Sequence, residues 1–334
     1  MTNGVRQGAV SSPILFSLYI DELFTVLRSS GLGCRLNNQF YGCLGYADDL
    51  LLLSASRSGL QSMVNSCSVF MKKKKLKFST NPDPAKSKTK CLIFSKKASD
   101  RVGVAPIKLN GDDLPWVAEV KHLGNLLECN NSMKRDLTVK RGKFIGKLNS
   151  LSQELYYTSP DTFIRILNIY AVSFHGSGLW DLFSDDCDRL YKAWNVAIRL
   201  ALKVPNTTHR YLIESLSGSL HPKVMLASRY FTFVQSLLNS PKYPVRVLAN
   251  LCTTDHRTVM GQCLSKISTE CGVARDDMAK LSSGMIKEKM RYFSVPEEQT
   301  WRIDILNELL NNVIDVEGFT DVEKQDMISF LCTT

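Results

Sequence analysis

The sequence predicts a mixed α/β unit followed by an all-helical region, and three observations support this. Short apolar runs of strand length alternate with helical apolar stripes as far as about residue 130. From Ser132 onward helical spacing continues and the strand patterns stop. At 334 residues the chain also exceeds the usual size of one domain. We expect an α/β domain over 1–130, a helical domain over 131–240 and a further helical region over 241–334.

The first predicted element is a helix over about residues 12–29. Its apolar residues recur at helical spacing, Ser12 can cap it, Pro13 fits its first turn, and two glycines follow its end. A second stripe at helical spacing predicts another helix between residues 57 and 78. These two helices would cover strands of the first unit.

Two segments rich in lysine follow in the first unit, and each has two interpretations. Lys72–Lys75 and Lys77 end the second predicted helix, and Lys86–Lys90 form a basic loop before a strand. Lysines at the end of a helix are favoured by the helix dipole, so a solvated helix end is one interpretation. Binding of phosphate groups is the other.

The tetrapeptide Tyr46-Ala47-Asp48-Asp49 stands between two apolar runs of strand length. We interpret these residues as a β-hairpin with an acidic turn. Adjacent carboxylates in an apolar setting repel each other, so both stay ionised there only if a cation such as Mg²⁺ neutralises them. The alternative is a solvated turn, because Asp is a common turn residue.

Further strands and helices follow from the same patterns. Strands are predicted at 91–94, at 107–109 before the turn Asn110-Gly111, and within 120–127. The predicted helices of the second part, with shorter ones between them, span about 132–156, 160–175, 185–203, 221–238 and 299–315.

Charge points to a polyanionic partner. The formal net charge is +10 and the sequence pI is about 9.1, which favours nucleic acid as the partner. The opening helix of the second part has a basic face suited to a phosphate backbone, although a solvated surface helix often has the same composition. The basic residues of that helix are Lys134, Arg135, Lys140, Arg141, Lys143 and Lys147.

Cysteine spacing and hydropathy argue against a zinc-binding, a membrane-spanning or a secreted protein. Most of the ten cysteines are scattered as expected for reduced core residues. The series Cys252, His256, Cys263 and Cys271 lacks the close second pair of structural zinc sites, so packing explains it better than a metal. No apolar run approaches the length of about 18 residues that spans a bilayer, and the start does not read as a signal peptide. We expect a protein of the nucleus or cytoplasm that is not secreted and has no membrane partner.

Several of these segments, taken in order, resemble consecutive motifs of the reverse-transcriptase palm. They are Gly4-Val5-Arg6-Gln7-Gly8, Ser12-Pro13-Ile14-Leu15-Phe16, Tyr46-Ala47-Asp48-Asp49, Lys88-Thr89 before Phe94, and Val120-Lys121-His122-Leu123-Gly124. Downstream, three segments are similar to the helical region after the palm in LINE-type, non-LTR retrotransposon polymerases. These are Gly178–Asp181, Ala193–Asn195 and Pro205–Arg210. The resemblance covers roughly residues 4–240.

The resemblance implies a polymerase palm followed by a thumb, with RNA-directed DNA polymerase activity that uses two Mg²⁺ ions on shared carboxylates. Asp48 and Asp49 match two metal ligands, and Lys88 matches a position near the phosphates that is a candidate proton donor. The matching nucleotide-binding residues are Arg6, Gln7 and Gly8. The implied nucleic-acid contacts are His122 and Gly124, to which the basic face adds Lys134, Arg135, Lys140 and Arg141. The implied partners are an RNA template, a DNA primer and deoxynucleoside triphosphates.

Each of these residues also has a purely structural interpretation. Gly8 and Gly124 can serve turns, Gln7 can cap a helix and Lys88 can be solvated. In family members a third metal-binding carboxylate lies on a strand before the motif that Arg6 and its neighbours match. We therefore expect a chain that begins inside the palm, without fingers or endonuclease, and that is inactive alone. The competing hypotheses are a non-catalytic nucleic-acid-binding remnant and a helical interaction protein.

Overall fold

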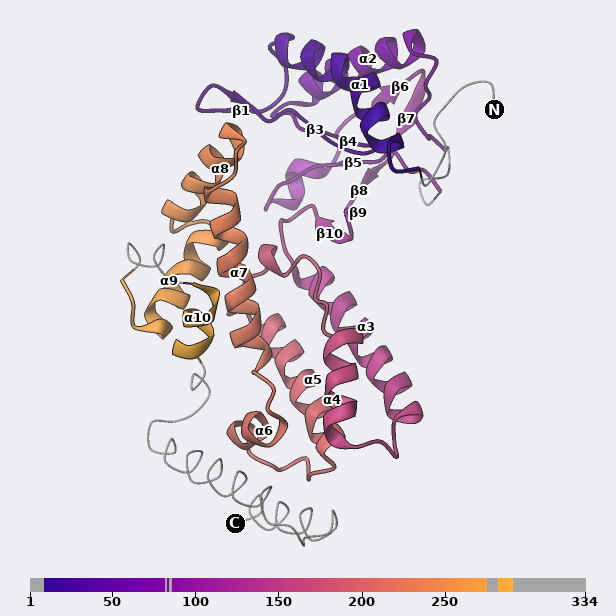
Figure 1. Ribbon diagram of the computed structural model, residues 1–334. Helices are drawn as coiled ribbons and strands as arrows, with labels where there is room; N and C mark the ends of the chain where they lie inside the picture. Colours follow the sequence, from indigo (N-terminus) through magenta and orange to yellow (C-terminus); the bar gives the residue numbers. More distant parts are fainter. Residues whose placement is uncertain (1–8, 82, 84–85, 275–281, 291–334) are drawn as a thin grey trace, which may run out of the picture. The chain divides into compact units, whose positions relative to one another are not determined.

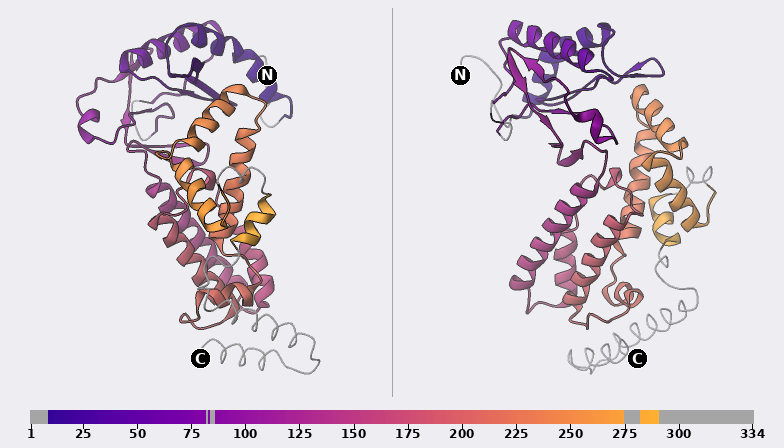
Figure 2. Two further views of the ribbon diagram at one scale, coloured as in Figure 1. Left: turned by 90° about the vertical axis from the view of Figure 1, so that its left-hand side faces the viewer. Right: turned by 180° about the vertical axis from the view of Figure 1, so that it is seen from behind.

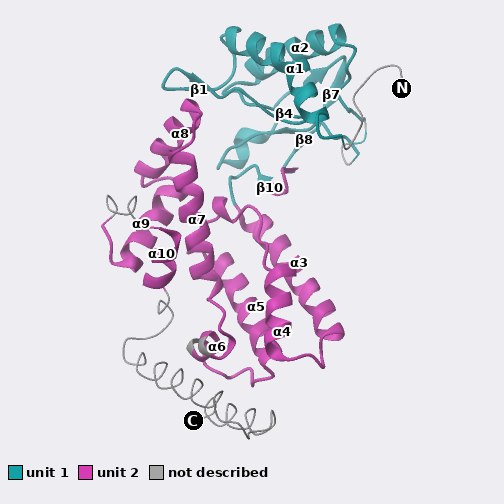
Figure 3. Ribbon diagram, in the orientation of Figure 1, with its two compact units in different colours: residues 1–120, 127–132 teal, residues 121–126, 133–334 magenta. Residues whose placement is uncertain are grey.

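The computed structural model describes residues 9–81, 83, 86–274 and 282–290, and the structural statements below concern these residues. The chain forms two compact units, one of residues 1–120 with 127–132 and one of residues 121–126 with 133–334 (Figures 1 and 3). The first contains the strands and the second is largely helical. This confirms the predicted fold class. The predicted boundary at residue 240 stays a prediction, and the predicted helix 299–315 lies outside the described residues.

In the first unit, two helices lie together along one side of the strands (Figure 2). The helices are α1 (Ser12–Ser29) and α2 (Arg57–Lys73), with a short 3-10 helix η1 (Ala98–Arg101). The strands, some of which continue into the second unit, are β1 (Arg35–Leu36), β2 (Gln39–Phe40), β3 (Cys43–Tyr46), β4 (Asp49–Leu52), β5 (Cys91–Leu92), β6 (Ile107–Leu109), β7 (Asp112–Leu114), β8 (Trp116–Val117), β9 (Glu119–His122) and β10 (Asn125–Glu128).

The ends of α1 and α2 differ from the sequence prediction in two details. Ser12 is the first residue of α1 rather than its cap, so that prediction is wrong, and the N-cap position is Ser11, without a capping side-chain hydrogen bond. Helix α2 ends at Lys73, because Lys75 adopts a φ of 56° that a right-handed helix cannot continue. Ser56 caps the start of α2 through a hydrogen bond from the Gly59 N–H.

The strands of the first unit pair two by two, and neighbouring pairs share the helix-covered core. Strands β1–β2, β3–β4 and β6–β7 are antiparallel hairpins, whereas β5 and β8 pair in parallel. Asn110 and Gly111 between β6 and β7 both have positive φ, as a type I′ turn requires. One core cluster joins α1, β3 and α2 through Leu23, Leu27, Cys43, Met63, Cys67 and Phe70, and a second contains Val64, Cys91, Ile107, Leu109 and Leu114.

The second unit packs its helices around one large apolar cluster that includes Trp180 and Trp194, both almost fully buried. Predicted helices are found here, but helix α4 ends at Tyr170, five residues before the predicted end. Phe174 and Gly176 have positive φ, so a right-handed helix could not have continued to residue 175. The helices are α3 (Lys134–Glu154), α4 (Pro160–Tyr170), α5 (Asp185–Leu202), α6 (Arg210–Ser217), α7 (Pro222–Leu238), α8 (Tyr243–Thr254), α9 (Val259–Cys271) and α10 (Ser283–Lys289), with a 3-10 turn η2 (Ser177–Leu179).

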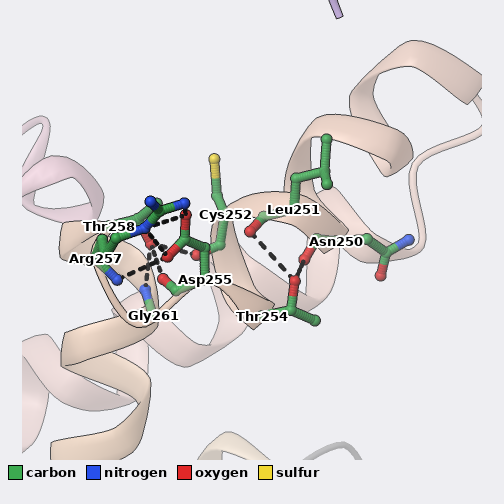
Figure 4. Close-up of polar contacts among 8 residues, drawn as sticks. All are labelled: Asn250, Leu251, Cys252, Thr254, Asp255, Arg257, Thr258 and Gly261. Atoms are coloured by element: carbon green, nitrogen blue, oxygen red, sulfur yellow. Dashed lines mark hydrogen bonds and ion pairs between the residues drawn. The ribbon is translucent and has the colours of Figure 1, made fainter. Parts of the chain in front are cut away.

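One member of the cysteine and histidine series noted in the sequence, His256, lies in the turn between α8 and α9, and Cys252 lies in the last turn of α8. Thr258 caps α9, accepting a hydrogen bond from the Gly261 N–H at 2.9 Å and donating to the Asp255 carbonyl at 2.8 Å (Figure 4). The Cys252 thiol points away from these contacts (Figure 4). Cys263 is buried, with its Sγ 3.6 Å from the Trp180 carbonyl oxygen. Burial and the capped turn account for these residues.

The cysteines that the structure describes are all free thiols. Burial raises the pKa of Cys43 and Cys187 to about 12, so both are protonated at neutral pH. Among the described helices, none is both long and apolar enough to cross a bilayer.

His221 is a buried ring at the start of α7. Its Nδ1 accepts a hydrogen bond from the Lys223 N–H at 3.2 Å, and its ring meets Tyr191 and Trp194 edge to face. Nε2 has no hydrogen-bond partner among the described residues. Loss of hydration lowers the pKa of His221 from 6.5 to about 3, because burial disfavours the charged ring.

We predict that His221 makes the helical unit sensitive to acid. Below pH 6.5 the unfolded chain protonates His221 and the folded chain does not, so the free energy of unfolding falls as the pH drops toward about 3. At about pH 5 the loss should be about 2 kcal/mol relative to neutral pH. His221→Asn keeps a good N-cap and should remove most of this loss in urea unfolding. The exposed His256→Asn serves as the control and should leave the loss unchanged; equal acid sensitivity of His221→Asn and the unmodified chain would contradict the assignment.

Candidate active site

The predicted acidic hairpin is present, with Asp48 in a two-residue turn. Tyr46 pairs with Asp49 at the end of the β3–β4 ladder, which leaves only Ala47 and Asp48 between the strands. Asp49 is therefore the first residue of β4 rather than part of the turn. Ala47 has a φ of 51°, a conformation that residues other than glycine adopt at a cost of about 1–3 kcal/mol. The turn is tight, and both carboxylates lie exposed at its tip.

Strand alternation decides which way Asp49 faces. Leu50 and Leu52 pack against the core cluster beneath α1 and α2. Side chains alternate between the two faces of a strand, so Asp49 lies on the opposite face, together with Tyr46 across the ladder. Tyr46 is 67% exposed. The hairpin thus buries one face and presents a carboxylate and a phenol on the other.

Helix α1 contacts the hairpin closely where Phe24 meets Gly45 of β3. An added Cβ at Gly45 would lie 2.5 Å from Cζ of Phe24, which is shorter than any normal contact. Only glycine lets the β3 backbone lie directly on this ring. Since Gly45 precedes Tyr46, the contact holds the acidic turn one residue away from a packed helix.

The surroundings of Asp48 and Asp49 leave both carboxylates available. Neither makes a hydrogen bond or an ion pair with another residue in the described part of the chain. Carboxylate oxygens are the ligands that Mg²⁺ prefers, so the donor chemistry fits this ion. Over residues 9–274 and 282–290, apart from the few masked positions, no three or more acidic, His or Cys side chains gather as a metal site. The hairpin alone therefore supplies two ligands.

Lys88 is exposed on a loop that hydrogen bonds hold in place. Buried Ser87 donates from Oγ to the Thr89 carbonyl at 2.7 Å, and Thr89 donates from Oγ1 to the Ser79 carbonyl at 3.0 Å. The Lys88 side chain makes no ion pair with any residue that the structure describes. Its predicted role near phosphates stays a prediction, as do the nucleotide-binding roles of Arg6, Gln7 and Gly8, which lie outside the described residues.

Part of the lysine run at the end of α2 is paired. Lys74 Nζ lies 3.0 Å from Glu22 Oε2 and sits over the rings of Tyr19 and Phe70. Lys73 Nζ lies 3.4 Å from the other oxygen of Glu22. The hydrogen bonds from Lys74 and Lys73 lower the pKa of Glu22. These two lysines join α2 to α1. The exposed members of the run are Lys72, Lys73, Lys75 and Lys77.

The second hairpin, β9–β10, turns at Leu123 and Gly124. Both residues have positive φ, 46° and 81°, as a type I′ turn requires. An added Cβ at Gly124 would lie 3.0 Å from Cδ2 of His175, whose Nε2 is 3.0 Å from the Leu123 carbonyl oxygen. Gly124 therefore serves both the turn and a close contact with His175. His122 is half-buried at the end of β9.

A buried carboxylate anchors this hairpin within the helical unit. Asp136, on the first turn of α3, is 3% exposed. Its Oδ1 accepts a hydrogen bond from the Leu126 N–H at 3.0 Å. Its Oδ2 accepts from Lys140 Nζ at 2.8 Å and from the Trp180 indole N–H at 3.1 Å. One side chain thus links β10, α3 and the residue that follows η2.

Lys140 belongs to this network, although the sequence placed it on a nucleic-acid-binding face. Its Nζ also donates to Asn125 Oδ1 at 2.7 Å and lies over the Trp180 ring, and its side chain is only 12% exposed. Lys147 is also paired within the chain, because its Nζ donates to the Tyr170 carbonyl at 2.6 Å. The spacing of four residues between Asp136 and Lys140 is a sequence signal that could have indicated the pair. The exposed basic residues of α3 are Lys134, Arg135 and Lys143, and Arg141 is half-buried.

Comparison with known proteins shows which sequences this chain resembles. Residues 1–125 match the family model described as reverse transcriptase (RNA-dependent DNA polymerase). Over 68 residues, 20% of this chain, the sequence is 38% identical to the Retrovirus-related Pol polyprotein from type-2 retrotransposable element R2DM of Drosophila melanogaster. Over 157 residues, 45% of this chain, it is 26% identical to the corresponding polyprotein from type-1 retrotransposable element R1 of Bradysia coprophila. The matched parts span 6% and 14% of these two relatives. The resemblance to non-LTR retrotransposon reverse transcriptases is confirmed.

We predict that the Asp136 network holds the β9–β10 hairpin to the helices. Asp136→Ala leaves the Lys140 ammonium without its buried partner and should cost about 3–5 kcal/mol in free energy of unfolding. The amide of Leu126 should lose protection in hydrogen exchange, because its acceptor is gone. Replacing both partners, as Asp136→Leu with Lys140→Met, should recover much of the stability. The exposed Asp161→Ala is the matched control; a loss as large as that of Asp136→Ala would show that the effect is not specific to the network.

Proposed function

We propose that this chain carries palm and thumb elements of an RNA-directed DNA polymerase, and that Asp48 and Asp49 hold its catalytic Mg²⁺. The observation that carries the proposal is the pair of exposed carboxylates at the tip of β3–β4, within the segment that matches the reverse-transcriptase model. A solvated surface turn does not require two adjacent acids, one in a strained two-residue turn and one at the start of β4, next to a backbone that is held against a packed helix. A metal site does, because its ligands must be held rigidly.

The chemistry follows from the polymerase reaction. Bound Mg²⁺ would activate the primer 3′-hydroxyl and neutralise the departing pyrophosphate. Asp48 and Asp49 would hold the ion, while Lys88 would lie near the phosphates as a proton donor. The nucleotide would be bound by Arg6, Gln7 and Gly8. The proposed substrates are deoxynucleoside triphosphates, an RNA template and a DNA primer, and the proposed location is the nucleus or the cytoplasm.

We propose that the β9–β10 hairpin and α3 bind the primer–template. His175 holds the turn at Leu123 and Gly124, directly after His122, and this turn would give the primer end a fixed support. Lys134, Arg135 and Arg141 would contact the phosphate backbone through α3. Lys140 acts differently in this proposal: its pairing with Asp136 positions the hairpin, so it supports binding without touching the nucleic acid.

We expect the two carboxylates to bind metal weakly by themselves. Mg²⁺ demands near-octahedral geometry and gives up water reluctantly, so two carboxylates without a third hold it poorly. Mn²⁺ relaxation measurements on the chain of residues 1–334 should therefore detect a weak site that Asp48→Asn abolishes. The exposed Asp112→Asn should leave that site intact, and metal binding that survives Asp48→Asn would refute the assignment.

In a primer-extension assay with Mg²⁺ and a primed RNA template, we expect the chain to extend the primer little. Robust extension that is lost in Asp48→Asn would support the polymerase and would overturn only the expectation that this chain is inactive alone.

A second candidate is a non-catalytic nucleic-acid-binding protein, favoured by the net charge of +10 and by the exposed lysines beyond α2. Under this proposal, binding of a primer–template should persist when Asp48 and Asp49 are both replaced by Asn. The logarithm of the binding constant should fall linearly with the logarithm of salt concentration, and its slope counts phosphate contacts. Lys75→Ala with Lys77→Ala should lower the slope by about 2 if both touch phosphates. No binding at low salt would favour a helical interaction protein instead.

A further inference from the structure

A shallow hollow in the first unit lies apart from the acidic hairpin. Its volume is about 370 Å³, within the range of roughly 300–1,000 Å³ typical of ligand sites. Two chain segments line it, one that follows β5 and one that follows β10: Phe94, Ser95 and Lys96 from the first, and Asn130 and Asn131 from the second. The proposed polymerase chemistry uses none of these residues.

Backbone hydrogen bonds hold the two segments side by side. The Ser95 N–H donates to the Cys129 carbonyl at 2.9 Å, and the Cys129 N–H donates to the Ala118 carbonyl at 2.8 Å. The chain then turns sharply, because Asn131 has a φ of 59° and its N–H donates to the Glu128 carbonyl at 2.9 Å. The walls of the hollow are thus fixed by main-chain contacts and do not depend on surface side chains alone.

The hollow combines an aromatic ring and two side-chain amides, which are groups that can stack on a nucleobase and hydrogen-bond to it. Phe94 is 52% exposed, although a phenylalanine beside a strand normally packs inward. The Asn131 side-chain amide has no hydrogen-bond partner among the residues described, so its donor and its acceptor are both available. Asn130 uses only its Oδ1, which accepts from the Ser132 N–H at 2.9 Å. An exposed ring beside amide groups offers a stacking surface and polar partners together.

The charge at the rim suits a phosphate. Lys96 and Lys97 are exposed and form no ion pair within the described residues. Asp100, the nearby acid on η1, accepts a hydrogen bond from Ser95 Oγ at 2.6 Å, and Arg101 donates to the Ser95 carbonyl. Two exposed ammonium groups therefore lie on the segment that lines the hollow, with one hydrogen-bonded carboxylate on η1 nearby.

We propose that this hollow binds an unpaired base of a single-stranded nucleic acid. The base stacks on the Phe94 ring, the Asn131 amide meets its polar edge, and Lys96 contacts the adjoining phosphate. A single strand is favoured over a duplex, because an aromatic side chain can stack on a base only when the base has left its own stack. The inference rests on the proposed function to the extent that the chain must work on nucleic acid, but it names a strand contact separate from the metal and hairpin sites.

The first test compares single-stranded and duplex binding by fluorescence anisotropy. Labelled RNA and DNA strands of about ten nucleotides suit the size of such sites. Phe94→Ala should weaken single-strand binding about five- to tenfold, Phe94→Tyr should retain it, and duplex affinity should not change. The control is Tyr157→Ala, which removes a different aromatic ring that is 94% exposed. Unchanged single-strand affinity in Phe94→Ala, or an equal loss for duplex, would overturn the inference.

A second measurement reports stacking directly. In Phe94→Trp, single strands should quench more tryptophan fluorescence than in the unmodified chain, because a base stacks on the new ring. Lys96→Gln should reduce the salt slope of single-strand binding by about 1. The double variant, Phe94→Trp with Lys96→Gln, should keep the quenching. Absence of this quenching argues against the site. Failure of the unmodified chain to bind either single strands or duplex would remove the proposed function and the inference together. Normal duplex binding with a silent Phe94→Ala would remove the inference alone.

Discussion

The buried carboxylate of Asp136 is the constraint on which the arrangement of the β9–β10 hairpin depends. It accepts hydrogen bonds from the Leu126 N–H, the Trp180 indole and Lys140 Nζ, so both oxygens of this buried carboxylate have partners. An unpaired charge there would cost several kcal/mol, so the three donors must stay in place together. This explains how residues 121–126, which form the turn end of a β-hairpin, belong to the helical unit.

The acidic hairpin follows the opposite design. Asp48 and Asp49 are exposed and have no partners among the described residues, while the backbone beneath them is held by Gly45 against Phe24. A group that must bind a ligand needs free lone pairs and a fixed position. The lone pairs are free because both carboxylates are exposed, and the position is fixed because Gly45, in the same hairpin, packs against Phe24. At β9–β10 a buried carboxylate is hydrogen-bonded and stabilises the structure, whereas at β3–β4 the carboxylates remain available to a ligand.

Local sequence patterns predicted most of the elements correctly, because their causes are local. Apolar periodicity located α1, α3, α5 and α7, and the Asn110-Gly111 pair predicted its type I′ turn. The acidic hairpin was also predictable, since two strand-length apolar runs flank two acids. Helix ends were less predictable: α2 and α4 end short of Lys75 and Phe174, whose positive φ is a feature that spacing alone does not reveal.

By itself the sequence determined the order of units, the acidic hairpin, the basic charge and the resemblance to reverse transcriptases. Only the tertiary structure decided which charges remain available. Lys140 resembled its neighbours on α3, yet its ammonium faces Asp136, because Asn125 of β10 and Trp180, which follows η2, meet there. The hollow beside Phe94 was equally hidden, since its two walls are separated by more than thirty residues of sequence. Distant segments meet only after folding, and the availability of a polar group depends on that meeting.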